Sequence, residues 1–186
     1  MNLLTALLAL QAASTAPMTE SAILDAFRSV CGRVEAFHDM RANARRNGWV
    51  ELNVAEEPRL QRMLGEGRAT LPVGARTSDA SFRPPAGPPD LFLVITRVET
   101  SAGWRSNCRF YHFGAASPLD ADRLQRWMGR PPTRQEADGP ANASFWEPGW
   151  SADMVIQISH IGAAHPMAIQ RGFSGNVLIA RAIGEF

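Results

Sequence analysis

The apolar stretch at the start of the chain indicates which residues form the folded protein and in which compartment they fold. Residues 1–16 carry no charged side chain, and their leucine- and alanine-rich run leads into small residues at positions 12–16. Such a run matches the core of a secretory signal peptide and is too short to cross about 30 Å of hydrocarbon. We expect a signal peptide at 1–16 and a periplasmic or secreted mature protein. The alternative is a packed N-terminal helix, although this stretch has no polar face.

The rest of the chain, residues 17–186, has the size of one domain. Hydrophobic residues make up 45% of the chain and charged residues 20%, as in globular proteins. No later stretch approaches the roughly 18 consecutive apolar residues of a membrane span. The net charge of +1 gives no reason to expect a nucleic-acid partner. The composition therefore predicts a single domain that does not span a membrane once the signal is removed.

All nineteen basic residues are arginine, and the chain has no lysine. The absence of lysine excludes Schiff-base catalysis, a pyridoxal-phosphate anchor, the usual phosphate-binding loop and the kinase lysine. No cofactor is expected.

The chain has only two cysteines, Cys31 and Cys108, so one intramolecular pairing is possible. An exported protein meets an oxidising compartment, where paired cysteines form disulfides. We expect a disulfide between them. The alternative is that Cys31 is a free nucleophile.

Three helices are expected. Apolar residues spaced by three and four positions predict a long first helix that ends before Gly48 and breaks near Asp39. A second helix is expected at about 56–66, where acidic residues and Pro58 crowd the first turn. A third runs from Ser117 to Met128, with Ser117 as its N-cap.

Alternating or continuous apolar patterns predict five strands, at 50–54, 91–95, 105–113, 154–158 and 177–183. Long Gly- and Pro-rich connections are expected at 67–89 and 130–150, with a Gly-rich segment at 161–176. These elements predict one α+β domain. Its mostly antiparallel sheet of about five strands is packed on one side by the long N-terminal helix and by the helix near 118–129.

Three features together resemble a group of small exported proteins of GC-rich proteobacteria that has no assigned activity. They are the apolar leader, the helical segment Phe27-Arg28-Ser29-Val30-Cys31, and Gly48-Trp49 before a strand. The resemblance covers mainly residues 1–54 and implies export and a disulfide with Cys108. It implies no catalytic residue.

Two clusters have residue types that bind metals. Cys31, Glu35 and His38 recur at helical spacing, and His160 and His165 are five positions apart. The first cluster loses its thiol if Cys31 is oxidised, and the second lacks the glutamate of the helical zinc motif. No metal site is predicted.

A surface formed by aromatic residues on Pro- and Gly-rich loops is the best candidate for recognition, because such residues supply contact area at low entropic cost. The alternative, which the sequence favours, is that the tryptophans close the ends of the core. The candidate surface contains Trp104, Trp146, Trp150, His160, His165 and Arg171.

These observations favour an exported, non-catalytic binding or interaction protein of the periplasm or cell envelope. Its partner would be an unidentified protein or small molecule. One alternative is an exported hydrolase with a loop-built site, but residues 172–176 lack the final glycine of a nucleophile elbow and precede a strand. The other is an inhibitor or immunity-type protein that blocks a partner enzyme. No catalytic residue is predicted.

Overall fold

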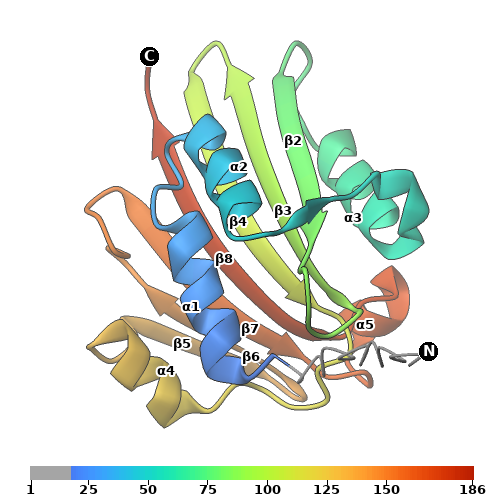
Figure 1. The fold of residues 1–186 in the computed structure, drawn as a ribbon, viewed down its shortest axis with the longest axis vertical. Coiled ribbons are helices and arrows are strands. Elements are labelled where there is room, and N and C mark those ends of the chain that lie inside the picture. The colour runs from blue at the N-terminus through green and yellow to red at the C-terminus, as the bar shows by residue number, and fades with distance from the viewer. Residues whose placement is uncertain (1–17) are drawn as a thin grey trace, which may run out of the picture.

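A single antiparallel sheet of eight strands forms the centre of the computed structural model, which describes residues 18–186 (Figure 1). The expected signal peptide lies outside these residues. The strand order is β1-β2-β3-β4-β8-β7-β6-β5, so the last strand, β8, pairs with β4 and β7 in the middle. The strands are β1 (Val50–Glu51), β2 (Arg76–Arg83), β3 (Leu91–Thr100), β4 (Gly103–His112), β5 (Arg134–Asp138), β6 (Ala141–Trp146), β7 (Met154–Ile161) and β8 (Gly175–Gly184).

The prediction of about five strands is therefore wrong. The three additional strands lie in segments expected to be connections: β2 in 67–89, and β5 and β6 in 130–150. Every residue of β5 is exposed, and the first three of β2 are too, so neither strand has the alternating burial that marks a strand in sequence. Both are strands because their backbones pair with a neighbouring strand.

The helices also differ from the predicted ones. The expected long first helix is two helices, interrupted at 32–36 and so before Asp39. The third predicted helix starts at Ala121, because Asp120 and not Ser117 accepts the capping hydrogen bond. A short helix lies in the segment expected to be Gly-rich coil. The helices are α1 (Glu20–Cys31), α2 (Phe37–Arg46), α3 (Pro58–Ala69), α4 (Ala121–Met128) and α5 (Pro166–Arg171), with a 3-10 turn at Val54–Glu56.

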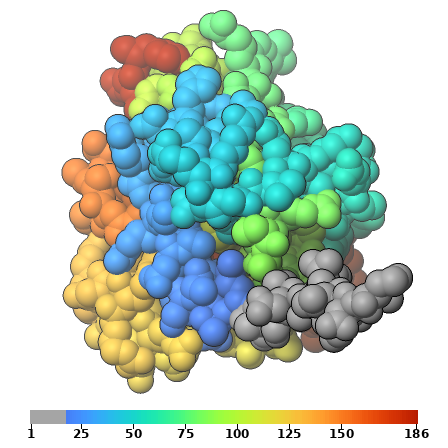
Figure 2. Space-filling model, viewed as in Figure 1, coloured from blue at the N-terminus to red at the C-terminus, as the bar shows by residue number. Residues whose placement is uncertain are grey.

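The first face of the sheet is covered by α1, α2 and α4, which lie in front of it in Figure 1. The space-filling view from the same side shows the surface over the sheet centre formed largely by α1, α2 and the segment after α2 (Figure 2). Phe27 of α1 is fully buried, and its ring centroid lies 5.4 Å from that of Phe110 on β4. The main hydrophobic core therefore lies between these helices and this face.

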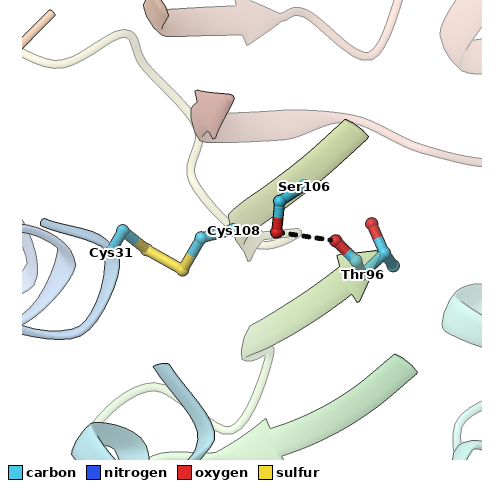
Figure 3. Close-up of a disulfide and its surroundings, with 4 residues drawn as sticks. All are labelled: Cys31, Thr96, Ser106 and Cys108. Carbon is cyan, nitrogen blue, oxygen red and sulfur yellow. Dashed lines mark hydrogen bonds between the residues drawn. A yellow bond between two sulfur atoms is a disulfide. The ribbon is translucent and has the colours of Figure 1, made fainter. Parts of the chain in front are cut away.

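The disulfide between Cys31 and Cys108 is present, so that prediction is confirmed (Figure 3). It joins the last residue of α1 to the middle of β4, with the two Cα atoms 5.5 Å apart. Both cysteines are fully buried in the main core. The bond therefore fixes α1 to a central strand across 77 positions of sequence.

The second face of the sheet is only partly covered. A smaller core, which includes Leu60 and Leu64 of α3, packs on β3 and β4 and on the first part of β8. Within residues 18–186 no helix packs on the other half of this face. None of the described helices has the length and apolar character of a membrane span.

One ion-pair cluster attaches α2 to the edge strand β1. The carboxylate of Glu51 accepts hydrogen bonds from Arg45 at 2.5 Å and Arg41 at 2.7 Å. The bond from Arg45 is the main reason that the pKa of Glu51 is lowered. Because the folded-state pKa lies below the unfolded one, this contribution to stability is present above about pH 4.5 and is lost as the pH falls through the folded-state value.

We expect Glu51→Gln to destabilise the protein by at most about 1 kcal/mol at pH 7, since the carboxylate is substantially exposed. Urea unfolding at pH 7 and pH 3 measures this effect. The difference from wild type should be smaller at pH 3, where more of the Glu51 carboxylate is protonated. A difference of equal size at both pH values would contradict an electrostatic role for Glu51.

Candidate functional site

The uncovered half of the second face is the candidate site, and we call it the open face. Its side chains come from four neighbouring strands, β4, β8, β7 and β6. Successive residues of a strand point to opposite faces of the sheet, and these residues alternate with the ones that point into the main core. Apolar, cationic and amide side chains share it, and most are half-buried or exposed. They are Arg105, Asn107, Arg109, Phe145, Val155, Gln157, Arg181 and Ile183.

Three arginines lie together on this face, and we call them the arginine cluster: Arg105, Arg109 and Arg181. Arg181 of β8 is paired in register with Asn107 of β4. Arg105 and Arg109 lie two residues to either side of Asn107, so both are diagonal neighbours of Arg181, at about 7–8 Å between Cα atoms. The sheet register therefore holds three positive charges close together on one face.

The arginine cluster has no carboxylate partner in the described part of the chain. Arg97, by contrast, is 2.8 Å from the Glu99 carboxylate, and ten other arginines also make an ion pair. Among residues 18–186, Arg109 donates only to the hydroxyl of Thr96, at 3.4 Å. Like charges that are not neutralised internally favour the binding of an anion from outside.

Arg181 is the most constrained member of the cluster. Its Nε is buried and has no hydrogen-bond partner among residues 18–186. Burial lowers the pKa of its guanidinium, and the positive charges of Arg109 and Arg105 lower the pKa further, whereas Glu147 raises it. A buried donor without a partner is costly, so an acceptor supplied by a ligand would relieve that cost.

A cavity of about 390 Å³ adjoins the cluster and shares Arg181 with it. This volume is within the range of small-molecule sites. Arg181 and Ile183 of β8 line one side, and the segment after β6 lines the other. The complete lining is Arg134, Phe145, Glu147, Ala152, Asp153, Met154, Val155, Arg181 and Ile183.

The tryptophans of the candidate surface lie on the core side of the sheet. Trp146 is 1% exposed, and its Nε1 donates to the carbonyl of Arg130 at 3.1 Å. Trp150 is partly buried, with its ring 5.5 Å from that of Phe27. Trp104 is partly buried at the start of β4, where Arg97 lies 4.4 Å over its ring.

The other candidate residues lie elsewhere. His160 is four residues beyond the partner of Trp146 on β7, about 13 Å along the strand, and its Nδ1 is 2.9 Å from Asn176 Oδ1. His165 is buried and caps α5, since its Nδ1 accepts the backbone N–H of Met167. Arg171 is exposed at the end of α5, 4.0 Å from Glu66. The structure does not bring the six residues together on one surface.

Sequence reasoning missed the arginine cluster. Arg105 and Arg109 have the same parity on their strand, which shows that they share a face. Nothing local indicates that β8 lies beside β4, and that pairing brings Arg181 to them.

The groups that could support catalysis or metal binding are few in the described part of the chain. Both cysteines are in the disulfide, and no serine hydroxyl is hydrogen-bonded to a histidine. No group of three or more His, Cys, Asp or Glu residues in this part is placed to hold a metal ion. Comparisons with protein-family models, curated proteins and solved structures found no match to this chain.

Proposed function

We propose that this is an exported, non-catalytic binding protein of the periplasm or cell envelope, and that its open face binds a ligand with a carboxylate or phosphate group. The observation that carries the proposal is the arginine cluster, three adjacent cations without a carboxylate partner in residues 18–186. Guanidinium groups form strong, charge-assisted hydrogen bonds with such anions.

Two further observations support the proposal. The buried disulfide is typical of proteins that fold in an oxidising compartment, which agrees with export. The cavity beside Arg181 has apolar residues next to its charged ones, an arrangement common in small-molecule sites.

Titration calorimetry with hexanoate tests the proposal, because this probe combines a carboxylate with a short apolar chain. We expect hexanoate to bind, and its neutral analogue hexanamide to bind at least about tenfold more weakly. Binding of hexanoate should also weaken as salt is raised, since added ions screen the cluster.

Arg181→Gln should weaken hexanoate binding by about tenfold or more, through loss of a charge-assisted hydrogen bond. Arg62→Gln is the matched control, because Arg62 is exposed on α3 and also has no carboxylate partner in the described residues. If both variants bind hexanoate as wild type does, or if hexanamide binds equally well, the open face is not an anion site.

A further inference from the structure

The cavity beside the arginine cluster has charges of both signs on opposite sides. Arg181 lies on β8, whereas Glu147 directly follows β6, and β7 runs between these strands. Asp153, just before β7, adds a second carboxylate. Both carboxylates are exposed, and neither makes an ion pair or accepts a hydrogen bond among residues 18–186, so both are free to bind a cationic group.

The register fixes the distance between the two kinds of charge. Val155 of β7 pairs with Arg181, and the next residue, Ile156, pairs with Trp146. Glu147 is therefore level with Arg181 across β7, two strand spacings away, or about 10 Å between backbones. An extended dipeptide is about 7 Å long. A ligand of that length can lie between the arginine and the glutamate with one charged end toward each.

Apolar side chains lie between the charged ones. Val155 is at the centre, and Phe145 and Ile183 flank it on neighbouring strands. The guanidinium of Arg134 stacks 4.0 Å over the Phe145 ring and is paired with Glu136, so it is already neutralised. The cavity thus has Arg181 on one side, an apolar floor with Asp153 at its end, and Glu147 on the other side.

We propose that the ligand of the open face is a zwitterionic short peptide of about dipeptide length with apolar side chains. Its carboxylate binds Arg181, its ammonium binds Glu147 and Asp153, and its side chains lie over Val155 and Phe145. This inference rests on the proposed function and adds the second charge and the length of the ligand.

Calorimetry with leucyl-leucine tests the inference against three analogues. N-acetyl-leucyl-leucine keeps only the carboxylate, leucyl-leucine amide keeps only the ammonium, and free leucine keeps both charges at shorter spacing. We expect leucyl-leucine to bind at least about tenfold more tightly than each of them, since each analogue lacks one charge or its spacing.

The double variant Glu147→Gln, Asp153→Asn separates the inference from the proposed function. It should weaken leucyl-leucine binding about tenfold and leave N-acetyl-leucyl-leucine binding unchanged or stronger. The control, Asp25→Asn with Glu66→Gln, removes two exposed carboxylates on α1 and α3. Circular dichroism establishes that each variant is folded.

Each of the other outcomes identifies which of the two proposals is wrong. Equal binding of the free and N-acetylated peptides, both dependent on Arg181, would overturn the zwitterionic ligand and leave the anion site intact. Equal binding of leucine and leucyl-leucine would overturn the peptide length. Failure of hexanoate and of every peptide to bind would overturn both proposals.

Discussion

Replacing both cysteines by alanine is expected to lower the free energy of unfolding by about 4 to 5 kcal/mol. The reason is that the bond closes a long loop, with a sequence separation of 77, so its removal greatly increases the entropy of the unfolded chain. For a chain of this size, the melting temperature should fall by roughly 10 to 15 °C. Urea unfolding followed by circular dichroism measures the loss.

Reduced wild-type protein is the control for this experiment, since it keeps every side-chain atom and lacks only the cross-link. Its loss of stability should account for most of that in the double variant Cys31→Ala, Cys108→Ala. If the reduced and oxidised proteins unfold at the same urea concentration, the cross-link contributes nothing and α1 is held by packing alone.

Trp146→Ala is expected to cost roughly 3 to 5 kcal/mol, the range for a large aromatic removed from a core. Trp146 is 1% exposed and packs in the main core, and its indole N–H has an acceptor in Arg130. Trp146→Phe fills most of the space and should cost less, about 1 to 2 kcal/mol, mainly for the lost hydrogen bond.

Trp150→Ala provides the comparison, because Trp150 is only partly buried. Its loss of stability should be smaller than that of Trp146→Ala when both are measured by urea unfolding. A loss of less than about 1 kcal/mol for Trp146→Ala would instead indicate that this tryptophan is available for recognition, as a loop aromatic would be.

The parts of the fold that were predictable are those in which burial leaves a periodic pattern. The apolar face of α1 and the apolar patterns of β4 and β8 predict which of their residues are buried in the core. The cysteine pairing was predictable because only one combination exists.

The parts that were missed depend on distant partners. β2 and β5 have little apolar alternation and are strands because of backbone pairing. The arginine cluster forms only because β8 lies between β4 and β7, and no local sequence pattern predicts that β8 takes this position in the sheet. The sequence predicts a connection at 130–150 because prolines and glycines lie on both sides of the short strand that ends in Trp146.

The central position of β8 has a consequence for how the protein folds. It joins two groups of strands, β1 to β4 and β5 to β7, which have no other pairing between them in the part of the chain that the structure describes. Since β8 follows all the other strands in sequence, the sheet cannot become continuous before this segment is present. Its pairing with β4 spans about seventy residues, so the chain must close a large loop when β8 pairs. The arginine cluster, whose members lie on β4 and β8, therefore assembles only when these two distant segments pair.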